Sequence, residues 1–420
     1  MKSILLSAYA ISPTKGSEFG VGWNFASNLA KTNIVYVLCG CTGGLMGDTS
    51  EIEAYLVKHP NPNIRLIPVR PTRLTNAINW LNKIGLFGPV FYLALPMWQK
   101  QAYERARQVI ATERIDIVHQ LNPIGFRDPG YLWKLDKPFV WGPIGGATFA
   151  SPVLLRGLPV RDRIYFLVKN LINFIQLRWS TRVHAAADKA SVLLFSNSEN
   201  QANFEHYLDK TGQLMPENAS FSGGAANVST HPTKGERLHL VWIGQISPRK
   251  NLHFILKALA LVENRDGWVL HIVGDGKIVK ELRRLSSRLG IADNVQWCGA
   301  KTRQEVISFL AFCDLHVMAS IAEGSPTVFW EAIGAGVPTL SLDRDGMRDT
   351  LINGGGILVP VSSYANTLVA YATKIDEIVN DPGLLISLRE GTRNIAKQES
   401  WEIRVSALER VYDAVSKSRT

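Results

Sequence analysis

The sequence has 420 residues, of which 46% are hydrophobic and 20% charged, and it predicts a soluble globular protein of two domains. Four cysteines are too few for a disulfide scaffold and predict reduced thiols in a cytosolic compartment; no apolar run approaches the roughly 18 residues of a membrane-spanning helix. The net charge of +10 falls mainly on residues 1–225, where 23 Lys and Arg against 15 Asp and Glu would suit nucleic acid, an anionic membrane or a phosphorylated substrate.

The first half of the chain alternates short apolar runs with longer helical patterns. The runs end near Gly, Pro, Ser or Asn, as buried strands of a parallel sheet do. Strands are expected at residues 3–8, 33–39, 63–69, 115–120, 138–143 and 191–198, and helices at 97–112 and 160–189. The first run is too short for a signal peptide, so it predicts a buried first strand.

The second half repeats this arrangement. Strands are expected at residues 238–244, 268–274, 294–299, 315–320, 337–342 and 356–361. The alternation predicts two doubly wound, Rossmann-like α/β domains, residues 1–225 and 226–399. The polar stretch 222–237 is expected to be the linker between them.

In open α/β sheets, ligands bind beyond the carboxyl ends of the strands. After the first strand, Gly16, Gly20 and Gly22 punctuate a loop expected to enter a helix at about Trp23, and its amides would suit a phosphate. A tight turn that merely needs glycine explains them equally well, because neither common nucleotide fingerprint is present. His119 is expected to end its strand and to donate to a hydroxyl or oxyanion, with a hydrogen-bonded core histidine as the alternative.

Two adjacent cations, Arg249 and Lys250, follow the strand that ends at Gly244. They stand at the entrance of an amphipathic helix, where positive charge opposes the helix dipole. A bound anion such as an oligophosphate would remove this conflict. The alternative is a pair of solvated surface cations.

Two acids flank an expected helix start in the segment EGSPTVFWE, residues 323–331. Ser325 suits the N-cap and Pro326 the first helical position, which leaves Glu323 in the preceding loop and Glu331 in the second turn. The helix N-terminus attracts phosphate, whereas the carboxylates accept hydrogen bonds from diols. A phosphate between two diols describes a nucleoside diphosphate sugar, although two glutamates eight positions apart also occur by chance.

Several segments in this order resemble the retaining GT-B glycosyltransferases of family 4, over nearly the whole chain. EGSPTVFWEAIGAGVPTL (323–340) is similar to the family's Glu-x7-Glu segment and the turn that follows it. VGDG (273–276) and NVQWCG (294–299) are similar to its nucleotide-binding strands. One bacterial branch of the family has segments that look like GSEFGVGWN (16–24), HQLNPIGFRDPG (119–130) and PFVWGPIGGA (138–147). SWEIRVSALERVYDAV (400–415) is similar to the terminal helix. The resemblance implies two Rossmann-like domains facing across a cleft, with residues 400–420 crossing back to the N-terminal domain.

The resemblance also implies roles for single residues. His119 would contact the donor sugar near the anomeric centre, Glu323 would bind the transferred sugar, and Lys250 would take the diphosphate; these three form the catalytic set. Glu331 would bind the ribose hydroxyls, and Gly16 would face the diphosphate across the cleft. The donor-binding set is completed by Gln245, Arg249, Gly274, Gly324, Ser325, Thr327 and Val328.

One departure from the family concerns the charge on the leaving diphosphate. Gln245 stands directly after Gly244, where the family usually has Arg, so one cation is missing unless Arg249 replaces it. A lost charge-assisted contact would remove about 2–4 kcal/mol of transition-state stabilisation. The resemblance implies no cofactor and no metal, and the Asp-x-Asp pattern at 343–345 is expected to be a polar loop, because its central Arg344 would oppose a metal.

The function expected from this resemblance is transfer of a sugar from a nucleotide donor to a glycan or lipid-linked acceptor in cell-surface polysaccharide synthesis. We expect a cytoplasmic enzyme at the inner face of the plasma membrane, with no nucleic-acid partner. The basic segment 154–179 has apolar residues at helical spacing and would contact anionic lipid, or else be an ordinary core helix with solvated cations. Alternatives are a glycosyltransferase making a small soluble glycoside, a sugar-nucleotide epimerase or hydrolase on the same fold, and a donor-binding protein without turnover.

Overall fold

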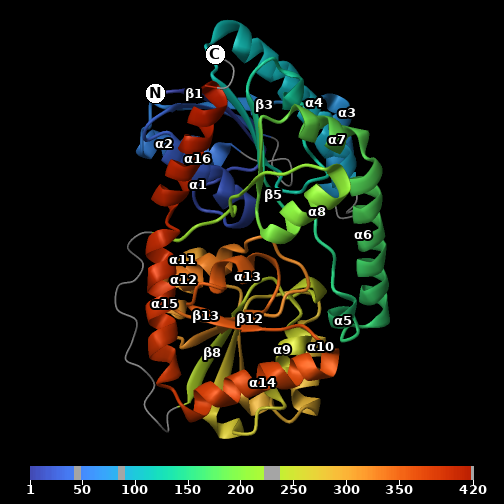
Figure 1. Ribbon diagram of the computed structural model, residues 1–420, viewed down its shortest axis with the longest axis vertical. Coiled ribbons are helices and arrows are strands. Elements are labelled where there is room, and N and C mark those ends of the chain that lie inside the picture. The colour runs from blue at the N-terminus through green and yellow to red at the C-terminus, as the bar shows by residue number, and fades with distance from the viewer. Residues whose placement is uncertain (42–48, 84–89, 222–236, 418–420) are drawn as a thin grey trace. The chain divides into compact units, whose positions relative to one another are not determined.

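The computed structural model describes residues 1–41, 49–83, 90–221 and 237–417, which form two compact units (Figure 1). Unit 1 comprises Met1–Ala147, Phe174–Glu217 and Trp401–Thr420, and unit 2 comprises Thr148–Asn173 and Asn218–Ser400. The expected division at 225/226 differs from this one, and all but the last residue of the expected linker 222–237 lies outside the described residues.

The main difference from the expected boundaries is the segment Thr148–Asn173, which belongs to unit 2 although it lies early in the chain. Leu154, Leu155, Leu158 and Phe166 explain this, because they are buried in the hydrophobic core of unit 2. Apolar burial of this kind is the dominant favourable term in folding, so it assigns the segment to that core.

Unit 1 contains a parallel sheet with the strand order β3-β2-β1-β4-β5-β6-β7. Its strands are β1 Ser3–Ala8, β2 Ile34–Gly40, β3 Ile64–Val69, β4 Ile117–Asn122, β5 Phe139–Ile144, β6 Val192–Phe195 and β7 Gln213–Leu214. Its helices are α1 Ser17–Leu29, α2 Ser50–Lys58, α3 Arg73–Lys83, α4 Phe91–Thr112, α7 Thr181–Lys189, α8 Ser198–Leu208 and α16 Trp401–Lys417. All six strands expected from the apolar runs are present, whereas the two-residue β7, with both side chains exposed, carries no apolar signal.

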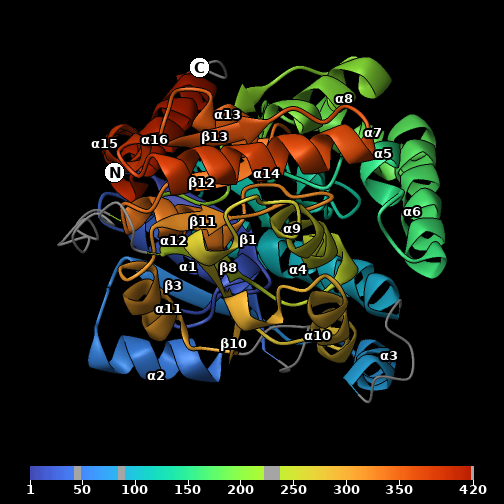
Figure 2. The same cartoon turned by 90° about the horizontal axis from the view of Figure 1, so that it is seen from below.

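Unit 2 contains a second parallel sheet with the order β10-β9-β8-β11-β12-β13. Its strands are β8 Leu238–Ile243, β9 Trp268–Val273, β10 Val295–Gly299, β11 Leu315–Val317, β12 Thr339–Leu342 and β13 Gly356–Val359. Its helices are α5 Pro152–Leu155, α9 Leu252–Leu259, α10 Val279–Arg288, α11 Arg303–Leu310, α12 Thr327–Gly334, α13 Asp345–Leu351, α14 Tyr364–Asn380 and α15 Leu384–Gln398. Figure 2 shows α14 lying along this sheet beside β13, consistent with their direct contact.

Three expected helix boundaries are wrong. The helix expected at 97–112 begins six residues earlier, at Phe91. The long helix expected over 160–189 is two helices, α6 Val160–Trp179 and α7, because the Ser180 hydroxyl accepts a hydrogen bond from the Val183 amide and caps α7. The helix expected from about Trp23 begins at Ser17, with Gly16 as its N-cap. The glycines at 20 and 22 therefore lie inside α1 rather than in a loop.

The C-terminal helix α16 belongs to unit 1, where it lies beside α1 (Figure 1). The edge of the Trp401 ring meets the Phe25 ring of α1 at a centroid distance of 5.2 Å. Both rings are buried, so this aromatic contact stabilises the packing of α16 against α1.

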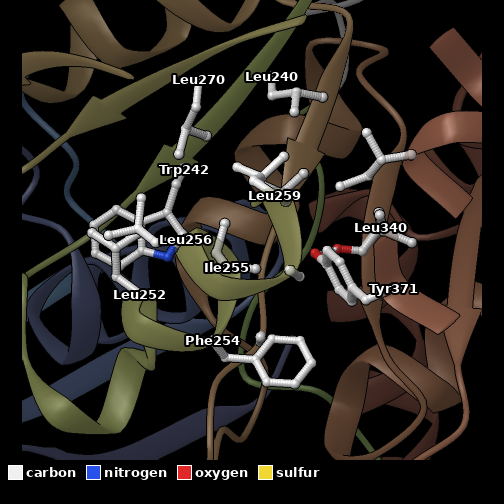
Figure 3. Close-up of a cluster of buried hydrophobic side chains, with 14 of the residues drawn as sticks. Leu240, Trp242, Leu252, Phe254, Ile255, Leu256, Leu259, Leu270, Leu340 and Tyr371 are labelled. Atoms are coloured by element: carbon white, nitrogen blue, oxygen red, sulfur yellow. Dashed lines mark hydrogen bonds between the residues drawn. The ribbon is translucent and has the colours of Figure 1, made fainter. Parts of the chain in front are cut away.

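The core of unit 2 is built by strands β8 and β9 packing against α9 and α14 (Figure 3). Trp242 lies beside Leu252 of α9, and Leu270 belongs to the same cluster. Tyr371 of α14 is fully buried, and its hydroxyl donates to the Leu340 carbonyl of β12 at 2.9 Å. The Tyr371 side chain thus satisfies its one polar group inside an apolar cluster.

Tyr371→Phe is expected to lower the free energy of unfolding by about 0.5–1.5 kcal/mol, because it deletes this hydrogen bond and keeps the ring. Urea titration measures the change. The matched control is Tyr364→Phe, since the buried Tyr364 hydroxyl has no hydrogen-bond partner among the described residues. An equal loss in both variants would show that the hydrogen bond is not responsible.

Candidate functional site

The sheet of unit 2 changes its winding direction between β8 and β11, which are neighbours in the sheet although β9 and β10 separate them in sequence. Ligands of doubly wound sheets bind at this switch point, beyond the carboxyl ends of the strands. The loops after the two strands are tied together there. The Ile321 amide donates to the Arg249 carbonyl at 2.9 Å, and the Asn251 side-chain amide donates to the Ala319 carbonyl at 3.1 Å.

Glu323 forms the centre of this switch point. Its Oε1 atom lies 2.7 Å from Lys250 Nζ and 2.6 Å from Arg249 Nη1. Burial alone would raise the pKa of the Glu323 carboxyl, but Lys250 and Arg249 outweigh it and hold the pKa below its usual range. The carboxylate therefore stays ionised, and the three side chains together carry one net positive charge.

The two cations differ in accessibility. The side chain of Lys250 is 11% exposed, whereas that of Arg249 is 41% exposed. Both cations thus pair with one carboxylate, and neither is a fully solvated surface cation. Their internal counterion is Glu323, a partner that the sequence analysis assigned to a sugar instead.

The loop that carries Glu323 is held firmly in place. The Glu323 amide donates to Asp345 Oδ2 at 3.1 Å, and the Asn218 side-chain amide donates to the Ser325 carbonyl at 2.7 Å. A Cβ on Gly346 would lie 2.2 Å from the Gly324 carbonyl oxygen, so only glycine allows this close approach. The loop backbone is therefore fixed from three sides.

Helix α12 begins directly after this loop, but its capping differs from the expectation. Pro326 occupies the N-cap, and the helix starts at Thr327. The expected Ser325 N-cap is wrong, because the buried Ser325 hydroxyl accepts a hydrogen bond from Trp330 Nε1 instead. First-turn amides of a helix, here those of Thr327 and Val328, have no intrahelical acceptor and suit a phosphate.

Glu331 lies in the second turn of α12, as expected, and is paired with Arg303. Arg303 Nε lies 2.8 Å from Glu331 Oε1, and the guanidinium stands 4.7 Å from the centre of the Phe221 ring. Burial raises the pKa of the Glu331 carboxyl, with Arg303 opposing the rise. Arg303 was not among the expected site residues. The one sequence signal near it is Thr302, whose capping box with Glu305 starts α11.

A pocket of about 300 Å³ opens at the carboxyl ends of β8 and β9. It is lined by Ile243, Gly244, Gln245, Val273, Gly274, Asp275, Ala300, Lys301 and Val306. Gly274 adopts φ +150°, and a Cβ there would lie 1.9 Å from the Gly244 carbonyl oxygen, so glycine brings the two strand ends together. A Cβ on Gly244 would lie 3.6 Å from Lys250 Cε, which places the pocket beside the cation pair.

The remaining expected site residues, Gly16 and His119, lie in unit 1. Gly16 caps α1, and no atom lies within 4 Å of where its Cβ would be. His119 was expected at the end of its strand, but β4 continues to Asn122, so the residue lies inside the strand. Their contacts with a donor stay predictions.

The His119 side chain is fully buried and held at both ring nitrogens. Nδ1 lies 2.6 Å from the Tyr412 hydroxyl and Nε2 lies 2.6 Å from the Gly142 carbonyl oxygen. Burial lowers the pKa of His119 to about 4, so the imidazole is neutral near pH 7. These contacts match the hydrogen-bonded core histidine that the sequence left open.

The Asp-x-Asp pattern at 343–345 is divided between two ion pairs. Asp343 pairs with Arg348 at 2.7 Å, and Asp345 pairs with Arg344 at 3.1 Å. Asp345 also supports the Glu323 amide, as described above. Within the described residues, no group of three or more His, Cys, Asp or Glu side chains has a metal-binding arrangement.

Most of unit 2 matches a known family of protein domains. Residues 227–399 match the family model described as Glycosyl transferases group 1. A GDP-mannose-dependent alpha-(1-6)-phosphatidylinositol monomannoside mannosyltransferase from Mycobacterium tuberculosis is 33% identical over 125 residues, 28% of this chain and 32% of that protein. The chain spans about half the length, or less, of the curated relatives it matches.

Solved structures match the chain over its whole length. A sucrose-phosphate synthase from Thermosynechococcus elongatus has a TM-score of 0.67 at 15% identity and covers 100% of both chains. Anabaena HepE in complex with UDP and glucose has a TM-score of 0.59 at 15% identity, with 99% of this chain and 100% of that chain covered. These matches and the two parallel sheets confirm the expected GT-B fold of two Rossmann-like domains.

Proposed function

We propose that the protein is a retaining glycosyltransferase of family 4. It would transfer a sugar from a nucleoside diphosphate donor to a glycan or lipid-linked acceptor, in the synthesis of a cell-surface polysaccharide. The observation that carries the proposal is the convergence of Lys250 and Arg249 on Glu323 at the switch point of the unit 2 sheet.

Each part of the donor has a matching feature in unit 2. The apolar walls of the pocket, Ile243, Val273 and Val306, suit the flat base of a nucleotide. The diphosphate would lie against the cation pair and the first-turn amides of α12, and its ribose hydroxyls would donate to Glu331. Binding of the diphosphate would give the two cations a second anion, while Glu323 becomes available to the sugar hydroxyls.

The leaving group decides the role of the cations in turnover. As the bond between sugar and phosphate breaks, negative charge grows on the departing diphosphate, and preformed positive groups stabilise this charge. Lys250 is held at its position by Glu323 before the donor arrives, so little reorganisation is needed. Arg249 stands beside it and supplies the second charge that Gln245 lacks. The departing phosphate assists attack by the acceptor from the same face, which gives retention without a carboxylate nucleophile.

The names of similar proteins support a nucleotide-sugar donor. Anabaena HepE was solved with UDP and glucose and also with UDP-glucose, and the mycobacterial mannosyltransferase is named as GDP-mannose-dependent. A cytoplasmic location fits the four cysteines, none of which forms a disulfide within the described residues. No helix within the described ranges is both long and apolar enough to cross a membrane.

A panel of nucleotide sugars should include one that raises the melting temperature of the protein. A donor at about 100 times its dissociation constant adds about 2.7 kcal/mol to the free energy of unfolding. Differential scanning fluorimetry measures the shift, and the matching nucleoside diphosphate alone serves as a control for base recognition. A panel of UDP, GDP, ADP and dTDP sugars without any shift would contradict the proposal. Donor consumed without acceptor would instead indicate an epimerase or hydrolase.

A further inference from the structure

Helix α6 buries the apolar Phe166 and Leu177, but unlike an ordinary surface helix it also exposes many apolar residues. Its buried face contains asparagines that hydrogen-bond to the backbone. The Asn170 side chain exchanges two 2.9 Å hydrogen bonds with the amide and carbonyl of Ala150, and the Asn173 side-chain amide donates to the Thr148 carbonyl at 2.7 Å. These bonds fix the rotation of the helix, so the opposite face must point to solvent.

The opposite face is apolar between its two ends, where Arg161 and Arg178 are exposed. Tyr165 is 62% exposed, Leu171 56% and Trp179 61%. The exposed apolar side chains of α6 are Val160, Ile164, Tyr165, Leu167, Val168, Leu171, Ile172, Phe174, Ile175 and Trp179. They recur every three or four residues, which makes one stripe about 30 Å long. A row of ten exposed apolar side chains on one helix is rare on a soluble monomer and marks a site of interaction.

The charges on the helix are almost all positive. Arg161 and Arg178 are exposed near its two ends, Arg163 and Lys169 lie half-buried between them, and Asp162 is its one acid. A partner of this face must therefore be apolar and negatively charged. A second copy of the same helix is apolar but positive, so two copies would repel each other through these cations.

We propose that α6 binds the surface of an anionic lipid bilayer, with its axis in the plane of the membrane. The apolar stripe enters the boundary between headgroups and acyl chains, and the terminal arginines contact lipid phosphates. Tyr165 and Trp179 have the amphipathic rings that favour this depth. The helix lies on the bilayer rather than crossing it, because its other face is committed to hydrogen bonds with the chain. The proposal rests on α6 alone and does not depend on the nucleotide donor.

Co-sedimentation with vesicles tests the proposal. The full-length protein should sediment with phosphatidylcholine vesicles that contain phosphatidylglycerol, and much less with phosphatidylcholine alone or in high salt. Leu171→Glu/Ile175→Glu should lower the partition coefficient at least about tenfold, since both side chains are exposed and would enter the bilayer. Arg161→Gln/Arg178→Gln should lower it roughly thirtyfold on anionic vesicles.

The matched control is Val369→Glu/Ile386→Glu, which places the same two charges at similarly exposed positions on α14 and α15. This variant should lose at most the small electrostatic contribution of two acids and sediment nearly as well as the wild type. Failure of the wild type to sediment with anionic vesicles, or equal loss in the control, would overturn the proposal. A wild-type dimer that Leu171→Glu/Ile175→Glu converts to a monomer would also overturn it, in favour of a second copy. Donor binding in solution should be the same in all these variants, so this test and that of the proposed function fail separately.

Discussion

Lys250→Ala is expected to lower turnover by about 10²–10³-fold while weakening donor binding much less. The Lys250 ammonium is the less exposed of the two cations at the switch point, and Glu323 holds it at one position. A preformed charge of this kind acts mainly on the charge that develops as the diphosphate leaves, so its loss raises the barrier more than it weakens the ground-state complex. Steady-state kinetics give turnover, and calorimetry with the intact donor gives affinity.

The control for Lys250→Ala is Lys280→Ala, because Lys280 is an exposed cation on α10 of the same unit. It removes the same charge from unit 2 and should leave both quantities unchanged. Since Lys250→Ala leaves Glu323 with Arg249 alone, thermal unfolding must show that the variant is folded. A folded Lys250→Ala with wild-type turnover would remove Lys250 from the catalytic set.

The strands and the chemistry near their ends were predictable from sequence, because a buried parallel strand is a short apolar run and ligands bind where it ends. Lys250 and Glu323 both follow such runs. What the sequence does not contain is the pairing of strands: β8 and β11 are neighbours only after folding, so the bond between Glu323 and Lys250 could not be foreseen. Arg303 was not predicted either, because its pairing with Glu331 joins two helices that are 28 positions apart in sequence at these residues.

Residue type alone does not predict the hydrogen bonds of a side chain where a tertiary contact determines them. Ser325 is a good N-cap by residue type, but its hydroxyl accepts a hydrogen bond from the indole of Trp330. For His119 the sequence left a donor contact and a core position open, and its hydrogen bonds to the Gly142 carbonyl and the Tyr412 hydroxyl depend on tertiary contacts that residue type does not reveal. The apolar spacing of α6 indicated an amphipathic helix, but it did not predict that Asn170 and Asn173 would fix the buried face through hydrogen bonds.

Glu331→Gln is expected to raise the dissociation constant of the donor about 10–100-fold, with a smaller change of turnover at saturating donor. The substitution keeps the shape of the side chain and removes the charge that ribose hydroxyls would bind. Hydrogen bonds to a charged group contribute about 1.5–3 kcal/mol each, and the neutral amide retains part of this. Calorimetric titration with the donor that the thermal screen identifies measures the change, and donor binding as tight as that of the wild type would remove Glu331 from the site.

Arg303→Gln tests the same carboxylate through pH. Burial raises the pKa of Glu331 and Arg303 opposes the rise, so without Arg303 the pKa should rise further. The ionised form binds the ribose, and donor affinity therefore falls as the pH drops through this pKa. Arg303→Gln should shift the fall to higher pH, whereas Glu331→Gln should abolish it. If the affinity of Arg303→Gln follows the wild-type pH profile, Glu331 does not bind the donor as a carboxylate, and its ion pair with Arg303 serves only to join α11 and α12.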